Sequence, residues 1–169
     1  MIDRWRTGVA WTLLLALSGF ACAAAPDGNQ RVPLVAPSAA SFSAVGTFLE
    51  HRCGTLDCHG QVGRNLRLYG YDGLRLAAAD LPGGAPTTAD EIAVDYQSVI
   101  GLEPEILAAV VEEGGAQPER LTLVRKGRGS EHHKGGALIM VGDAQDRCLT
   151  SWLAGAVDAA ACADTLTTP

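Results

Sequence analysis

The distribution of cysteines constrains this chain of 169 residues more than any other feature of its sequence. One of the five cysteines, Cys22, lies in an apolar N-terminal segment, and the other four follow it. Cys53 and Cys58 are separated by only four residues, and His59 comes directly after the second of them. Cysteines at this spacing close a short loop, whether they bind each other, a metal ion or a cofactor. The fold therefore has to be organised around this loop.

The N-terminal segment has the pattern of a secretory signal peptide. Arg4 and Arg6 precede an uncharged stretch, 8–25, that ends in small residues. A positive start, an apolar centre and an Ala-x-Ala site are typical of a cleaved export signal, and we expect cleavage after Ala23. An uncleaved membrane anchor and a lipoprotein acylated at Cys22 are the alternatives. We expect the remaining chain in the periplasm or cell envelope, where disulfides persist.

Composition and charge exclude several classes of protein. Hydrophobic residues make up 47% of the chain and charged residues 19%, which is enough for a packed core. The net charge of −6 argues against nucleic-acid binding through a basic face and against a polybasic membrane binder. We therefore expect no binding to nucleic acid and contact with a membrane only through an N-terminal anchor. We also expect a monomer.

The chain divides into a signal peptide (1–23), a flexible tether rich in Pro, Ala and Ser (24–42) and a mainly α-helical domain (43–169). Thr88 with Glu91 forms a capping box, and Asp143 is a good N-cap. These signals, with glycine and proline boundaries, predict helices over 43–52, 88–101, 104–114 and 144–156. The segment 64–76 has alternating apolar residues and is predicted to be a short hairpin or an irregular loop.

The pattern of Cys53, Cys58 and His59 matches what covalent haem attachment needs. Each thiol adds to one vinyl group of the haem, and the histidine after the second cysteine becomes the proximal iron ligand. The usual motif has two residues between the cysteines, so the two extra residues would form a bulge in the loop. Three other interpretations are a Cys53–Cys58 disulfide, a thioredoxin-type redox pair and a zinc site.

At these residues the chain resembles the c-type cytochromes, in the variant with a four-residue spacer. Two later stretches, 133–136 and 148–155, look like the C-terminal half of secreted bacterial cytochrome c domains, where a loop precedes a helix containing a tryptophan. The resemblance covers about 43–156. It implies a small helical domain with long loops that carries one covalent haem c and exchanges electrons with a redox partner protein.

The second axial ligand of the iron has three candidates. His133 ranks first because it lies in a polar loop beside glycines, where the backbone can pass close to a haem face. Met140 ranks second, although its apolar neighbours favour a core side chain over a ligand. His132 ranks third. We expect the flanking segments 121–124 and 137–141 to pack in the core and to hold the loop in place.

Basic side chains just after the motif are candidates for binding the haem propionates. Arg64 and Arg67 follow His59 closely, and a guanidinium group matches a carboxylate geometrically. A solvated strand face is the alternative interpretation of both residues. Cys148 and Cys162 are left as a pair once the other cysteines hold haem. After export we expect them to form a disulfide that contributes roughly 3 kcal/mol.

The leading hypothesis is a monohaem electron carrier of the bacterial cell envelope, which is not an enzyme. The alternative, from a different class, is a haem-free secreted or lipid-anchored module that is stapled by disulfides and acts in binding or assembly. A haem enzyme such as a peroxidase would need an open sixth position on the iron.

Overall fold

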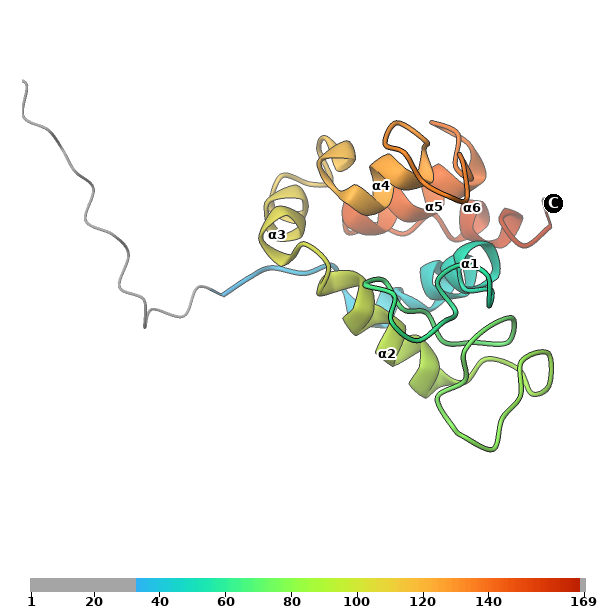
Figure 1. Ribbon diagram of the computed structural model, residues 1–169. Coiled ribbons are helices and arrows are strands. Elements are labelled where there is room, and N and C mark those ends of the chain that lie inside the picture. The colour runs from blue at the N-terminus through green and yellow to red at the C-terminus, as the bar shows by residue number, and fades with distance from the viewer. Residues whose placement is uncertain (1–32, 168–169) are drawn as a thin grey trace, which may run out of the picture. The chain divides into compact units, whose positions relative to one another are not determined.

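The computed structural model describes residues 33–167, and these form a mainly helical domain, as predicted (Figure 1). The signal peptide and most of the tether lie outside the described residues. The described part contains six α-helices and no β-strand. The helices are α1 (Ser43–Cys53), α2 (Ala89–Ile100), α3 (Pro104–Glu112), α4 (Thr122–Gly127), α5 (Ala144–Leu153) and α6 (Ala159–Asp164). Within 33–167, no helix has both the length and the apolar character needed to cross a membrane.

Helix α1 packs between α2 on one side and α5 with α6 on the other (Figure 1). Its apolar residues Val45, Phe48 and Leu49 are all buried in the core. Gly46 permits the close approach of α2, since a Cβ atom there would lie 3.1 Å from the Ile92 Cδ1 atom. Because α1 ends at Cys53, the packing of the core fixes where the cysteine motif begins. The prediction that a helix delivers the first cysteine is confirmed.

Helices α5 and α6 form the C-terminal part of the core. Asp143 caps α5 by accepting a hydrogen bond from the Asp146 backbone, as its position predicted. Trp152 is 1% exposed and packs in the centre. The predicted disulfide between Cys148 and Cys162 is present and joins the two helices. The helix predicted over 144–156 ends at Leu153, and α6 was not expected from the sequence.

The domain begins earlier than the predicted boundary at residue 43. The Tyr96 hydroxyl donates to the Pro37 carbonyl at 2.9 Å, and the Trp152 indole donates to the Ser38 carbonyl at 3.2 Å. Phe42 is 1% exposed. Buried Tyr and Trp side chains need partners for their polar atoms, and here the backbone of 37–38 supplies them. The last residues of the predicted tether therefore belong to the domain.

The segment 54–88, between α1 and α2, is irregular rather than a hairpin. A single isolated bridge joins Tyr69 to Leu74. The buried Arg75 side chain organises this segment, because its Nε and Nη2 atoms donate to the two carboxylate oxygens of Glu91 at 2.8 and 3.1 Å. The same guanidinium donates to the carbonyl of Ala85 at 2.7 Å. A chain without regular structure is thus held by a buried cation.

The capping box predicted at the start of α2 is confirmed, and it is part of the same network. Thr88 accepts a hydrogen bond from the Glu91 backbone, and the Glu91 carboxylate accepts one from the Thr88 backbone at 2.8 Å. Burial acts to raise the pKa of Glu91, but hydrogen bonds from Arg75 and from the Thr88 and Leu76 backbones outweigh it and lower the pKa to about 2.

Candidate functional site

The cysteine motif forms a tight turn directly after α1. The His59 backbone donates to the Cys53 carbonyl at 2.9 Å, which closes the loop between them. The Gly54 carbonyl packs against the Cα atoms of Gly60 and Gly73, where a Cβ atom would clash with it. The four-residue spacer is accommodated in this turn, which glycines allow to fold tightly.

The ring of His59 is held in one tautomer by a backbone hydrogen bond. Its Nδ1 atom lies 2.9 Å from the Leu66 carbonyl oxygen. A carbonyl can only accept, so Nδ1 carries the proton and Nε2 keeps its lone pair. Metal-binding histidines commonly have this second bond. Burial lowers the pKa of His59, with the Leu66 hydrogen bond opposing it and the nearby charges of His133 and Arg64 adding to it. The ring is therefore kept neutral, as a metal ligand requires.

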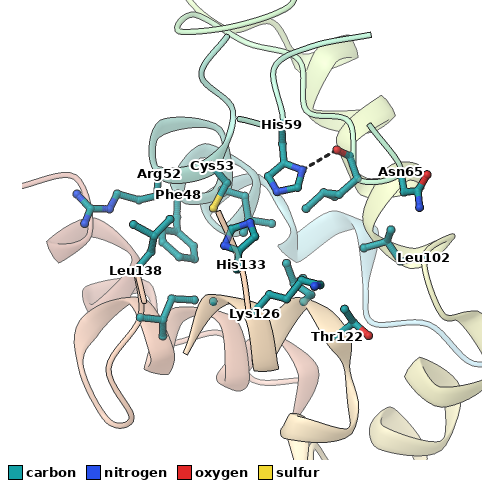
Figure 2. A pocket seen from close by; sticks show the side chains of 15 residues that line it. Phe48, Arg52, Cys53, His59, Asn65, Leu102, Thr122, Lys126, His133 and Leu138 are labelled. Carbon is teal, nitrogen blue, oxygen red and sulfur yellow. Dashed lines mark hydrogen bonds between the residues drawn. The ribbon is translucent and has the colours of Figure 1, made fainter. Parts of the chain in front are cut away.

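His133 lies across from His59, although the two are far apart in the sequence. The ring centres are 5.8 Å apart and the ring planes differ by 20°. Figure 2 shows the two side chains reaching toward one another from different segments. Two imidazoles that bind one metal ion from opposite sides, each at about 2 Å, have ring centres about 6 Å apart. The observed spacing is close to that value, and the two rings are nearly parallel, in a stacked arrangement.

The His133 ring also has a polar atom that needs a partner. Its Nδ1 atom is buried and makes no hydrogen bond within the described part of the chain. Buried polar atoms are nearly always paired, and a buried atom without a partner calls for an explanation such as a bound group. A metal ion beside the ring is one such explanation, because a neutral imidazole is a common metal ligand.

The two histidines border a cavity of about 300 Å³, at the lower end of the range for cofactor sites (Figure 2). Its walls are mostly apolar and come from α1, α4 and the loops: Phe48, Leu49, Leu66, Leu102, Leu123, Leu138 and Ile139. Cys53 also lines it. An apolar cavity with two imidazoles and a thiol on its walls suits a flat, largely apolar cofactor that carries a metal.

Cys53 and Cys58 are both free thiols in the structure. Burial, together with the nearby Cys58, raises the pKa of the Cys53 thiol to about 12. A thiol with so high a pKa is a poor nucleophile at neutral pH, which argues against a thioredoxin-type redox pair. Cys58 is half-buried and lies outside the cavity lining, next to His59 in the turn.

The zinc interpretation of the motif finds no support in the geometry of residues 33–167. In that range, the group of three or more His, Cys, Asp or Glu residues whose ligand atoms all lie within 4.8 Å of one another is Glu50, His51 and Asp72. In that group His51 already pairs with Asp72 at 3.1 Å, and the Asp72 backbone donates to Glu50 at 3.0 Å.

Met140 does not occupy the place expected for it. Its side chain is 68% exposed and does not line the cavity, so the prediction of a core side chain was wrong. Of the predicted core segment 137–141, only Ile139 is fully buried, because the chain turns away to the surface after it. His132 is exposed as well. The structure thus brings His133, and neither of the other two candidates, opposite His59.

The basic residues that line the cavity are not the ones singled out in the sequence. Arg64 is exposed and close enough to His59 to influence its pKa, but neither it nor Arg67 lines the cavity. Arg52 and Lys126 do, together with the polar residues Asn65 and Thr122. Arg52 directly precedes Cys53, and this adjacency is the one signal that could have identified it.

Comparison with known proteins gives no match to this chain, whether among family models, curated proteins or solved structures.

Proposed function

We propose that this protein is a monohaem c-type cytochrome that carries single electrons in the bacterial cell envelope. The observation that carries the proposal is the pair of facing imidazoles, His59 and His133, at 5.8 Å in an apolar cavity beside Cys53. When bound, haem supplies an iron that alternates between two oxidation states and so takes up one electron at a time.

Within this proposal the two cysteines attach the cofactor. Each thiol would add across one vinyl double bond, with sulfur bonding to one carbon and the thiol hydrogen to the other, so that no oxidant is needed. Both thiols are free, which this addition requires, and the pKa of about 12 means that Cys53 would enter the reaction as the protonated thiol. Their placement at the end of α1 and in the following turn puts both next to His59.

His59 and His133 are the residues that would hold the haem iron. His59 is prepared for this by the Leu66 carbonyl, which fixes the proton on Nδ1. His133 contributes an imidazole, which gives a lower reduction potential than a thioether ligand would. Two protein ligands leave no open position for a peroxide, so we propose an electron carrier rather than an enzyme.

The charged groups near the cavity are proposed to bind the haem propionates. Lys126 and Arg52 lie on its walls, and Arg64 lies near His59. Arg67 does not line the cavity, and this role is not assigned to it. These cations also offset the negative charge that two propionates bring into a partly apolar site.

The haem-free alternative is a module stapled by two disulfides. The Cys148–Cys162 bond fits this alternative as well as the cytochrome, but Cys53 and Cys58 are unbonded. This alternative also provides no partner for the buried Nδ1 atom of His133, which makes no hydrogen bond in the described part of the chain.

The test is haem content after maturation in cells that express haem-attachment machinery. The wild-type protein should keep its haem through acid–acetone extraction, and the double variant Cys53→Ala/Cys58→Ala should lose it. The matched control is Cys148→Ala/Cys162→Ala, which also removes two sulfurs but leaves the motif intact and should keep its haem. A wild type without covalent haem, or equal haem in both double variants, would overturn the proposal.

A further inference from the structure

We propose that Glu131 is a positioning residue that, with Arg125 and Lys126, holds the loop 128–138 so that His133 faces His59. This inference rests on the proposed function, since it concerns the second axial ligand of the iron. It assigns Glu131 and Arg125, which do not line the cavity, to keeping that ligand in place, and gives Lys126, which does line it, a second task beside binding a propionate.

The two ends of the loop are pinned together at its base. The Gly127 carbonyl accepts hydrogen bonds from the backbones of both Leu138 and Ile139, at 2.9 and 3.0 Å. Ile139 is 4% exposed and packs directly over Gly127, where a Cβ atom would lie 2.8 Å from its Cδ1 atom. The base therefore belongs to the core, and the remaining freedom of the loop lies in the part that carries His133.

Glu131 ties that part to α4 with both of its carboxylate oxygens. One oxygen lies 2.8 Å from the Arg125 Nε atom and the other 2.8 Å from the Lys126 Nζ atom. Lys126 also donates to the carbonyl of His132 at 3.2 Å. The two residues directly before His133 are thus gripped by two neighbouring cations.

Arg125, which binds Glu131, is itself held in place by hydrogen bonds. The Arg125 Nη2 atom donates to the Thr122 hydroxyl at 2.7 Å, and the Thr122 backbone and hydroxyl donate to the Glu103 carboxylate at 2.6 and 2.8 Å. Glu103 is the residue that precedes α3. The position of the loop is thereby fixed by α4 and by the start of α3 rather than by contacts within the loop.

The ion pairs of Glu131 are expected to affect the position of His133 more than the free energy of unfolding. All three side chains are about one-third exposed, and ion pairs at that exposure contribute little to folding stability. Ligand binding at the iron is more sensitive than folding stability, because the fraction of time for which His133 occupies the iron determines how well an added small molecule competes with it. Loss of the grip should therefore change ligand exchange at the iron while leaving unfolding nearly unchanged.

The experiment compares haem-loaded wild type with Glu131→Gln, which removes the charge and keeps the size. Carbon monoxide binds ferrous haem only after His133 has left, so its apparent affinity reports how firmly the loop is held. We expect binding about fivefold tighter in Glu131→Gln. The denaturation midpoint should not move, and Glu131→Asp should return part of the way to wild type.

The matched control is Glu113→Gln, which removes a similar exposed pair with Arg120 at 2.7 Å that lies outside the loop. It should bind carbon monoxide as the wild type does. Equal affinities in Glu131→Gln and Glu113→Gln, with haem attached in both, would overturn this inference alone. A wild type that holds no haem would overturn it together with the proposed function. If Glu131→Gln fails to mature, Arg125→Gln removes the partner of Glu131 that does not line the cavity and should show the same shift.

Discussion

The two sides of α1 are stabilised in opposite ways. The segment 54–88, which contains the cysteine motif, has no regular helix and is fixed by buried charged groups, above all Arg75 with Glu91. The segment 144–164 consists of two helices that are fixed by apolar packing around Trp152 and by the Cys148–Cys162 disulfide. Both segments pack on the same helix, which delivers Cys53 to the site.

The two segments have different structural roles. The apolar, disulfide-bonded side supplies a rigid base against which α1 can pack. The irregular side must bend the chain so that His59 meets the Leu66 carbonyl and the cavity, a shape that no regular helix provides. Buried ion pairs specify such a shape through directional bonds, at a cost in desolvation that apolar packing does not have. The predictions below test this contrast.

The largest effect is expected for Arg75→Met. Removing the cation leaves the Glu91 carboxylate, which is 1% exposed, charged without its partner. Breaking a buried pair in this way costs about 3–5 kcal/mol of unfolding free energy. Urea denaturation measures it, with Arg147→Met as the control, since the Arg147–Asp158 pair is exposed and its closest atoms are 3.7 Å apart. Equal losses in the two variants would show that the segment 54–88 does not depend on its buried cation.

The next effect belongs to the other side. The double variant Cys148→Ala/Cys162→Ala should lower the free energy of unfolding by roughly 3 kcal/mol, because it removes a cross-link over 14 residues. Haem attachment should be unaffected, as the bond lies outside the cavity. Denaturation of the oxidised wild type beside the variant gives the value. A variant as stable as the wild type would mean that apolar packing alone holds α5 against α6.

Asp95→Asn should instead stabilise the protein, on the order of 2 kcal/mol at pH 8. Asp95 is fully buried and accepts a hydrogen bond from the Tyr69 backbone at 2.7 Å, which an amide oxygen can also accept. Burial, together with the charges of Glu50 and Glu91, raises the pKa of Asp95 to about 7, against the Tyr69 bond.

The sign of the pH dependence follows from this raised pKa. The folded protein keeps the Asp95 proton when the unfolded chain has lost it, so wild-type stability from this group falls as pH rises from about 4 to about 7. The advantage of Asp95→Asn should grow over the same window and then level off. Denaturation curves at pH 4, 6 and 8 check this, and a constant advantage at all three would contradict it.

The smallest effect is expected for Met140→Ala, below about 0.5 kcal/mol, because the side chain is 68% exposed. Its neighbour Ile139 is buried, and Ile139→Ala should cost about 2–5 kcal/mol. Denaturation of the two variants under the same conditions compares them directly. A large loss for Met140→Ala would place that side chain in contact with the core or the cofactor.

Local signals in the sequence predicted the local structure well. The Thr88–Glu91 capping box, the Asp143 cap and the helix leading to Cys53 were all identified, because the bonds that define them lie within a few residues. The disulfide could be predicted because export favours disulfides and the haem hypothesis reserves Cys53 and Cys58, which leaves Cys148 and Cys162 as a pair.

Features that depend on contacts between distant residues could not be predicted. Arg75 finds Glu91 across 16 residues, and Asp95 meets the Tyr69 backbone across 26. The apolar run around Met140 predicted burial, but the turn that exposes it is set by the distant partner of Ile139 at Gly127. Lys126 lines the cavity because the helix that carries it, α4, forms part of the cavity wall, and no local sequence pattern reveals this.

The central claim, that His59 and His133 hold one haem iron between them, is tested most directly by the absorption spectrum of the oxidised, haem-loaded protein. The account predicts a low-spin spectrum without a sulfur-to-iron band near the red end of the visible range. His133→Ala should convert it to high spin, because the iron loses one strong ligand, and Met140→Ala should leave it unchanged. A sulfur-to-iron band in the wild type that disappears in Met140→Ala would contradict the claim, as would a His133→Ala spectrum identical to that of the wild type.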